Sequence, residues 1–331
     1  MTPIAGPCRN LCAALLVALP LLACAVGSEQ TGAAALAPEA AAADTPRTAK
    51  PRAAKPQSIA PQRSAREAVR ALDQEAIAAI FDRQRALLKR ALDGVAPSRP
   101  GMPEFYFIGF AGDASEHVFL NEARAAEDVF RRRFGSGGRS LVLANNLGTA
   151  KQLPKATAST LELALKGVAA KMGAEDVLIL YVTSHGWRRR ISVRYGRVKL
   201  PSLRARELRR MLDDAGIQNR VVLLSACYSG SFIPALANDN TLIMTAAAHN
   251  RVSFGCGHDG AFTYFGQALI GEALERETSF ARAFRGAARA IGKREKEDGF
   301  KPSRPQFFQG TKIGAAIDAV QSRLGPRGRD H

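Results

Sequence analysis

Several features that define common protein classes are scarce in this chain of 331 residues. Five cysteines are too few for a scaffold held together by disulfides. No apolar run reaches the roughly 18 residues that a membrane-spanning helix needs. There is no internal repeat, and no motif of interleaved basic and aromatic residues that would indicate nucleic-acid binding. Hydrophobic residues still make up 46% of the chain, which excludes a wholly disordered protein and provides material for one large core.

The first segment has the composition of an export signal. Arg9 is the only charge before residues 11–22, which are uncharged and mostly apolar. This order is typical of a secretory signal peptide, so we expect export to the periplasm or cell envelope. Leu21-Leu22-Ala23-Cys24 resembles a bacterial lipobox, which favours a lipoprotein anchored to the membrane through lipid on Cys24. Ala23-Cys24-Ala25 also fits cleavage by the ordinary signal peptidase.

Composition divides the chain into four parts. We expect residues 1–23 to be the signal peptide, and residues 24–63, rich in Ala and Pro, to be a disordered tether. Residues 64–94 carry apolar side chains at helical spacing and predict an amphipathic helix, which is either a stalk or docked on the domain. The folded domain spans residues 104–323.

Strand-like and helix-like runs alternate from residue 104 onwards. Short, almost wholly apolar runs suit strands buried on both faces of a parallel sheet, and amphipathic stretches lie between them. This alternation predicts an α/β sandwich, with a hairpin inserted at 191–198 and a capping box formed by Ser159 and Glu162. The expected strands are 105–110, 141–144, 177–182, 221–224, 242–245 and 306–309, and the expected helices are 121–134, 159–172, 202–215, 261–275 and 279–297.

Two of the expected strands end in reactive side chains. Strand 177–182 is followed by Thr183-Ser184-His185-Gly186, and strand 221–224 by Ser225-Ala226-Cys227-Tyr228. The carboxyl ends of parallel strands meet ligands, so His185 and Cys227 lie side by side if these strands are neighbours. A free thiol with a pKa near ~8.5 is mostly protonated at neutral pH, and a nearby imidazole favours the thiolate. Each residue alone is more often structural, but together they predict a thiol nucleophile with an imidazole partner.

Tyr181–Gly186 and Ser225–Ser231 resemble the His and Cys signatures of the C13 (legumain-like) cysteine peptidases, in the caspase-like clan. Residues 252–256 and 262–266 resemble the bacterial branch of this family. The likeness covers roughly residues 104–309. It implies a caspase-like three-layer α/β/α sandwich with a mostly parallel sheet, and endopeptidase chemistry on a peptide or protein substrate. In this family His185 would be the general base and Cys227 the nucleophile, with the backbone N–H groups of Gly186 and Cys227 forming the oxyanion hole.

The sequence departs from the family pattern at two positions. Legumains have Glu two residues before the nucleophile, where this chain has Ser225, so asparaginyl specificity is not expected. The first strand runs into Asp113 rather than into the Asn that supports the His of the family, and Asp113 is a candidate to orient His185. Ser225 is a candidate substrate-binding residue.

Trp187 and Arg188, which follow the His185 motif, are further candidates for substrate binding. Trp187 either lines a peptide cleft or anchors its loop in the core. Arg188 opens a run of three arginines that either meets an acidic substrate or an anionic surface, or is a solvated loop. The formal net charge of +17 favours contact with anionic envelope components over nucleic acid in an exported protein.

We therefore expect an exported cysteine endopeptidase that works through a thioester acyl-enzyme. Two alternatives stay open: a transpeptidase that uses the same dyad, and a non-catalytic envelope lipoprotein that uses the fold as a binding module. We expect no cofactor and no metal, because His249, Cys256 and His258 match no standard zinc spacing. Cys227 and Cys256 either pair as a disulfide or stay free.

Overall fold

The computed structural model describes residues 79, 82–257 and 260–324. The predicted signal peptide, the tether, Cys24 and most of the first half of the expected helix at 64–94 lie outside these residues. Residues 82–93 are helical, and Gly94 follows in a turn. Leu88 is part of the buried core, and Ala91 and Leu92 pack against it. This part of the segment is therefore docked on the domain.

A six-stranded sheet forms the centre of the domain, in the order β2-β1-β3-β7-β8-β9. The first five strands are parallel, and β9 runs antiparallel to β8 at one edge. Every residue of β1, β3, β7 and β8 is buried, as expected for parallel strands covered on both faces. The strands are β1 (Phe105–Ala111), β2 (Ser140–Ala144), β3 (Val177–Thr183), β7 (Asn219–Ser225), β8 (Thr241–Thr245) and β9 (Gln306–Gln309).

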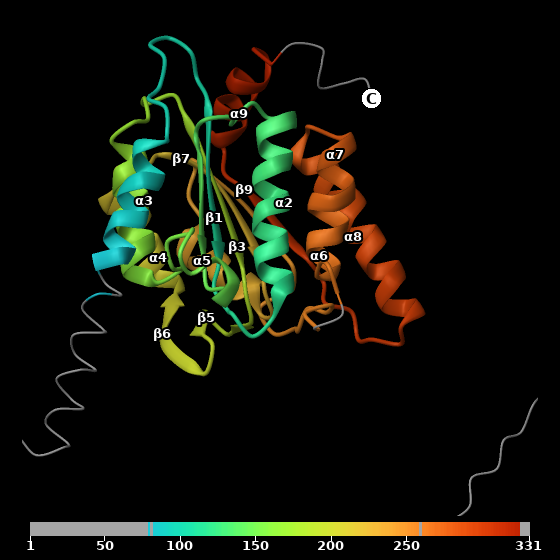
Figure 1. The fold of residues 1–331 in the computed structure, drawn as a ribbon. Coiled ribbons are helices and arrows are strands. Elements are labelled where there is room, and N and C mark those ends of the chain that lie inside the picture. Colours follow the sequence, from blue (N-terminus) through green and yellow to red (C-terminus); the bar gives the residue numbers. More distant parts are fainter. Residues whose placement is uncertain (1–78, 80–81, 258–259, 325–331) are drawn as a thin grey trace, which may run out of the picture. The chain divides into compact units, whose positions relative to one another are not determined.

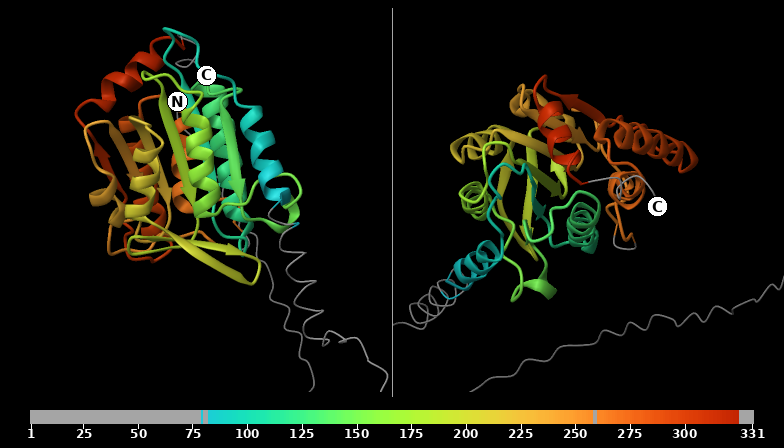
Figure 2. Two further views of the ribbon diagram at one scale, coloured as in Figure 1. Left: turned by 90° about the vertical axis from the view of Figure 1, so that its left-hand side faces the viewer. Right: turned by 90° about the horizontal axis from the view of Figure 1, so that it is seen from above.

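Helices cover both faces of this sheet (Figures 1 and 2). Alternate residues of a strand point to opposite faces, so Phe105 and Phe107 of β1 enter one core, and Tyr106 and Ile108 enter the other. The first core lies under α2 (His117–Arg133), α8 (Phe280–Glu297) and α9 (Ile313–Gln321), and the second lies under α3 (Ala158–Ala169), α4 (Ala205–Asp214) and α5 (Ile233–Leu236). The predicted α/β/α sandwich with a mostly parallel sheet is confirmed.

A second, three-stranded sheet follows β3 directly. It consists of β4 (Gly186–Trp187), β5 (Arg190–Tyr195) and β6 (Val198–Arg204), all antiparallel. Figure 1 shows β5 and β6 beyond one end of the central sheet. The sequence predicted this hairpin but ended it too early. Residues up to Arg204 pair with β5, so α4 begins at Ala205 and not at residue 202.

Two helix predictions were also imprecise. The helix expected from Ser159 begins at Ala158, because Thr157 is its N-cap and its hydroxyl accepts a bond from the Thr160 N–H. The helix expected at 261–275 is divided into α6 (Tyr264–Gly266), a π-helical stretch (Gln267–Ala273) and α7 (Leu274–Arg276). Within the described residues, no helix is both long and apolar enough to cross a membrane.

Candidate active site

The two reactive side chains predicted from the sequence follow neighbouring strands. In the register of β3 and β7, Thr183 is the partner of Ser225, so His185 and Cys227 each lie two residues beyond the same pair. The Ser184 N–H donates to the Ser225 carbonyl at 3.2 Å, which extends the contact past the strand ends. Both His185 and Cys227 are half-buried. The adjacency that the sequence predicted is therefore present, and both side chains have partial access to solvent.

Gly186 allows the two strand ends to approach closely. A Cβ atom at this position would lie only 2.3 Å from the Cys227 carbonyl oxygen and 2.9 Å from the Ala226 Cβ. No other residue fits without moving the backbone that carries the nucleophile. The main chain after His185 is therefore packed directly against the main chain of Cys227.

A tight turn follows Cys227. Tyr228 has a φ of 56°, in the left-handed region that a bulky residue seldom adopts. Its N–H donates to the Arg251 carbonyl at 2.7 Å, and its carbonyl accepts bonds from the N–H and the hydroxyl of Ser231 at 3.0 and 2.6 Å. These bonds hold the turn in a conformation that costs energy, and such strain is often found at functional sites.

The Cys227 sulfur makes its hydrogen bonds with Ser253. The Ser253 N–H donates to Sγ at 3.3 Å, and the Ser253 hydroxyl donates to it at 3.6 Å. The thiol in turn lies 3.5 Å from the Ser253 carbonyl oxygen, to which it donates. Ser253 was not among the predicted site residues. The only signal in the sequence was its place in the segment 252–256 that resembles the family.

Aromatic rings fix the position of Ser253. The ring of the next residue, Phe254, stacks on Phe300 with centroids 4.3 Å apart and planes at 2°. The Phe254 carbonyl also accepts a bond from the Tyr264 N–H at 3.0 Å. The donors that face the Cys227 sulfur therefore belong to a segment that is anchored on both its side chain and its backbone.

The His185 ring packs against Phe119 on α2. The two centroids are 5.1 Å apart and the planes meet at 82°, an edge-to-face arrangement. Asp113, the candidate to orient His185, is buried and accepts bonds from Ser115 and from the Ser192 hydroxyl. The Ser192 N–H donates to the His185 carbonyl at 2.8 Å. The described contacts therefore connect Asp113 to the backbone of His185 through Ser192, and not to the imidazole.

Ser225 belongs to a buried polar network behind the nucleophile. Its hydroxyl lies 3.1 Å from the Thr263 hydroxyl, and the Thr263 N–H donates to Glu122 at 2.6 Å. Glu122 is fully buried and also accepts bonds from the hydroxyls of Tyr181 and Thr183, at 2.9 and 2.7 Å. Burial, and then the charge of Glu122, raise the pKa of Tyr181 well above its usual value. Ser225 is thus buried within the domain and bonded to Thr263.

Cys256 is a free thiol, as is Cys227. Its side chain is half-buried and packs against the core that lies under α2. Burial, and then the proximity of Cys227, raise the pKa of Cys256 above its ordinary value. Cys256 therefore stays protonated to higher pH than an exposed thiol.

Trp187 and Arg188 both lie at the surface. Trp187 is 64% exposed, which contradicts the alternative that it anchors its loop in the core. Its ring lies 4.9 Å from the ring of Tyr228, the residue after the nucleophile. Arg188 is exposed beside it. Their role in substrate binding stays a prediction.

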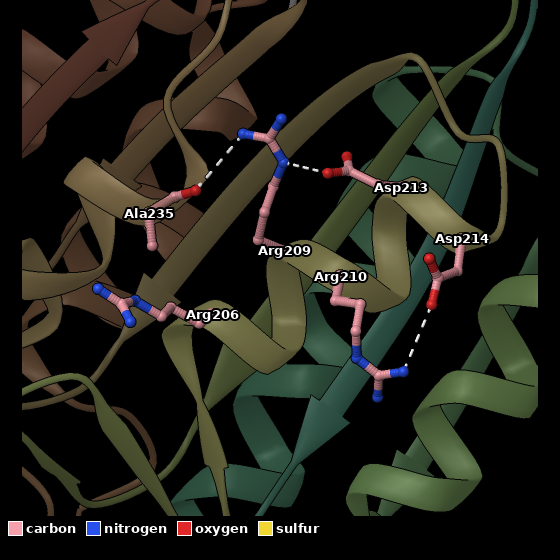
Figure 3. Close-up of a pocket in the computed structure, with 6 residues that line it drawn as sticks. All are labelled: Arg206, Arg209, Arg210, Asp213, Asp214 and Ala235. Atoms are coloured by element: carbon pink, nitrogen blue, oxygen red, sulfur yellow. Dashed lines mark hydrogen bonds and ion pairs between the residues drawn. The ribbon is translucent and has the colours of Figure 1, made fainter.

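A separate pocket of about 420 Å³ lies on the outer side of α4 (Figure 3). It contains neither His185 nor Cys227. Arg209 pairs with Asp213, and Arg210 pairs with Asp214 at 3.4 Å. The pocket is lined by Arg206, Arg209, Arg210, Asp213, Asp214 and Ala235. Among the residues that the structure describes, no group of His, Cys, Asp and Glu side chains has the arrangement of a metal site.

Comparison with known proteins supports the interpretation of the two motifs. Residues 157–309 match the model of the Peptidase C13 family. This match begins just before α3, ends with β9, and includes both His185 and Cys227. No curated protein matches the chain. Residues 157–309, which lie in the sandwich domain and contain both signatures, are therefore similar to the Peptidase C13 family of legumain-like cysteine peptidases.

Proposed function

We propose that this protein is a cysteine endopeptidase in which Cys227 and His185 act as a dyad. The observation that carries the proposal is the register of β3 and β7, which pairs Thr183 with Ser225 and brings the two motifs to one edge of the sheet. The close packing of Gly186 on the Cys227 carbonyl supports it, since a bulkier residue would separate the two strand ends. The match to the Peptidase C13 family supports cysteine peptidase activity in general, and we attribute this activity to Cys227 and His185.

The reaction follows from the chemistry of these groups. His185 accepts the proton of the Cys227 thiol, and the sulfur attacks the carbonyl carbon of the scissile peptide bond. The backbone N–H groups of Gly186 and Cys227 hold the oxyanion of the tetrahedral intermediate. His185 then gives its proton to the leaving amine, the C–N bond breaks, and a thioester forms. Water hydrolyses the thioester, which returns the thiol and releases the acid.

The reactivity of Cys227 tests the dyad before any substrate is known. The protein is alkylated with iodoacetamide between about pH 5 and pH 9, and labelling of Cys227 is followed by peptide mapping. We expect fast labelling at neutral pH that slows at least about tenfold in His185→Ala. His249→Ala is the matched control, because His249 is exposed and has no part in the dyad. Slow labelling that is equal in all three proteins would contradict the proposal and favour a binding module.

A peptide library then tests hydrolysis itself. We expect the protein to cleave library members and Cys227→Ala to cleave none. Repeating the reaction with an added amine distinguishes the two fates of the thioester. Products that carry the amine would identify a transpeptidase, and products with free carboxylates identify a hydrolase.

We also propose export and lipid anchoring at Cys24. The support is the sequence alone: one positive charge, an apolar stretch and then Leu21-Leu22-Ala23-Cys24. Metabolic labelling with a radioactive fatty acid tests it. We expect label in the native chain and none in Cys24→Ala. Label that is absent from both, with the protein in the soluble periplasmic fraction, would instead support cleavage by the ordinary signal peptidase.

A further inference from the structure

Positive charge is concentrated in the segment that follows the His185 motif. Residues 188–210 contain ten Lys and Arg residues and one acidic residue, Glu207. This segment alone accounts for more than half of the formal net charge of +17. It forms most of the three-stranded sheet and the first part of α4. The charge of the domain is therefore strongly localised.

The strands β5 and β6 place like charges opposite each other. Arg190 is the partner of Arg204, and Arg194 is the partner of Lys199. We call these four residues the basic face. Side chains of like charge in directly opposite positions destabilise an antiparallel pair. In the part of the chain that the structure describes, none of the four has a carboxylate at ion-pair distance, so the repulsion is not compensated within the domain.

The antiparallel pair β5–β6, called the ribbon below, is held to the domain by the face opposite the basic face. Ile191, Val193 and Leu203 are buried in the core under α3 and α4. Arg190, Lys199 and Arg204 are exposed, and Arg194 is half-buried, with its Nε donating to the Gly196 carbonyl at 3.0 Å. Three of the four side chains of the basic face, those of Arg190, Lys199 and Arg204, are therefore open to an external anion.

The basic face begins beside the nucleophile. Trp187 of β4 is the partner of Arg190 of β5, and its ring contacts Tyr228, the residue after Cys227. The Arg189 N–H donates to the Ser231 hydroxyl at 2.7 Å, which ties the ribbon to the turn that follows the nucleophile. A chain that lies along the ribbon therefore passes close to Cys227.

The positive surface ends on α4. Figure 3 shows Arg209 and Arg210 joined to Asp213 and Asp214, whereas no bond is drawn to Arg206. Arg206 is exposed and adds one more positive charge next to the basic face. After Arg206, the arginines of α4 are paired with carboxylates of the same helix. Within residues 188–210, the basic side chains without a carboxylate at ion-pair distance therefore all precede Arg209.

We propose that the basic face binds an acidic segment of the polypeptide substrate and holds it next to the scissile bond. This proposal rests on the proposed peptidase function and names its substrate class. The two basic pairs are four residues apart on β5, about 13 Å along an extended strand. Acidic side chains on one side of an extended peptide repeat about every 7 Å, so alternate Asp or Glu residues match this spacing. The position beside Cys227 favours a substrate over a more distant anionic surface.

A binding experiment tests the proposal without requiring cleavage. The full chain with Cys227→Ala is titrated with a fluorescent peptide of alternating Glu and Ala, and with its Gln counterpart. We expect the Glu peptide to bind more tightly at low salt and to lose affinity as salt is added. Adding Arg190→Gln and Arg204→Gln is expected to weaken binding of the Glu peptide about tenfold. The fold should survive, because this double variant removes a repulsive pair.

The control removes two positive charges elsewhere. Arg285→Gln with Arg289→Gln changes the net charge by the same amount on α8, where both side chains are exposed. We expect it to leave binding of the Glu peptide unchanged. Equal losses in the two double variants would mean that only net charge matters and would overturn the proposal. Equal binding of the Glu and Gln peptides would overturn it as well.

Two further measurements locate the bound peptide. In the chain with native Cys227, the Glu peptide should slow alkylation of that thiol, and Arg190→Gln with Arg204→Gln should remove the protection. Binding without protection would place the peptide away from the nucleophile and contradict a substrate role. Vesicles of anionic phospholipid are tested with Cys24→Ser variants. If only vesicle binding depends on Arg190 and Arg204, the basic face contacts membrane and the substrate proposal is wrong.

These outcomes are separate from those of the dyad. A Cys227 that is unreactive in the absence of peptide contradicts the peptidase proposal, whatever the Glu peptide does. A reactive Cys227 together with Glu and Gln peptides that bind alike contradicts only the role of the basic face.

Discussion

The Phe119 ring meets the His185 ring at 82°, with centroids 5.1 Å apart. Phe119 is buried on α2, so a rigid helix sets the position of this contact. Phe119 touches the imidazole itself, whereas Asp113 reaches only the backbone of His185 through Ser192. Phe119 is therefore a positioning residue for His185, and its effect should appear in the reactivity of Cys227.

Replacing Phe119 by Leu keeps an apolar side chain but removes the ring edge. We expect alkylation of Cys227 at neutral pH to slow about fivefold, because the imidazole loses its preferred orientation. The free energy of unfolding should fall by only about 1–2 kcal/mol. Phe130→Leu is the control, since Phe130 is buried on the same helix and stacks on Phe107. If Phe119→Leu and Phe130→Leu slow alkylation of Cys227 equally, Phe119 contributes only core packing and does not orient His185.

Removing the Ser253 hydroxyl tests its bond to the Cys227 sulfur. Hydrogen-bond donors stabilise negative charge on sulfur, and Ser253→Ala removes one of two donors while leaving the N–H. We expect alkylation of Cys227 to slow about twofold to fivefold at neutral pH and to recover at high pH. Val252→Ala, at the exposed neighbouring position, is the control. If Cys227 is alkylated in Ser253→Ala at the native rate at every pH, the Ser253 hydroxyl does not affect the reactivity of the thiol.

Glu122 should contribute strongly to stability. Glu122→Ala leaves three buried donors, from Tyr181, Thr183 and Thr263, without their acceptor. We expect the free energy of unfolding to fall by about 3–5 kcal/mol, measured by urea denaturation. Glu122→Gln keeps one acceptor oxygen and should cost clearly less. Glu127→Ala is the control on the same helix, where the carboxylate is only half-buried and bonds to Ser140. A loss below about 1 kcal/mol in Glu122→Ala would show that water replaces the carboxylate.

Stability should decrease at alkaline pH in two stages. The pKa values of Cys256 and Tyr181 are both raised in the folded protein, first by burial. The folded state then holds protons that the unfolded chain releases above about pH 8.5 for Cys and about pH 10 for Tyr. Because the native state binds more protons in these ranges, the free energy of unfolding falls as pH rises.

Urea denaturation between about pH 7 and pH 11 measures both stages. Cys256→Ala should remove the first stage and leave the second, which begins near pH 10. The free energy of unfolding of this variant should be flat around pH 9. A decline near pH 9 that persists in Cys256→Ala would mean that another group causes it.

The sequence was sufficient for the sheet and for the two reactive side chains. Apolar runs bounded by polar residues located the strands to within about two residues, because a strand covered on both faces is mostly apolar along its whole length. The motifs after two of these strands then located His185 and Cys227. The two side chains lie close together because the carboxyl ends of adjacent parallel strands meet at one edge of the sheet.

The contacts around the two side chains could not be predicted in this way. Glu122 is an ordinary position of the expected helix at 121–134, and Phe119 precedes that helix, because α2 begins four residues earlier, at His117. Ser253 reaches Cys227 from a loop that has no periodic pattern. Such contacts depend on how elements far apart in the chain pack in space, and no local spacing reports that. The helix starts at Ala158 and Ala205 were missed for a different reason, because a cap or a strand pairing outweighed the composition.

The antiparallel edge strand has a consequence for the order of folding. Strand β8 pairs with β9, and Thr245 meets Gln306, about sixty positions later in the chain. The hydrogen-bonding groups along that side of β8 therefore stay unpaired until Gln306–Gln309 have emerged. A chain that stalls or is truncated before Gln306 would present an open strand edge to its neighbours, which is a route to aggregation. Strand β9 thus determines whether β8 is paired on both sides.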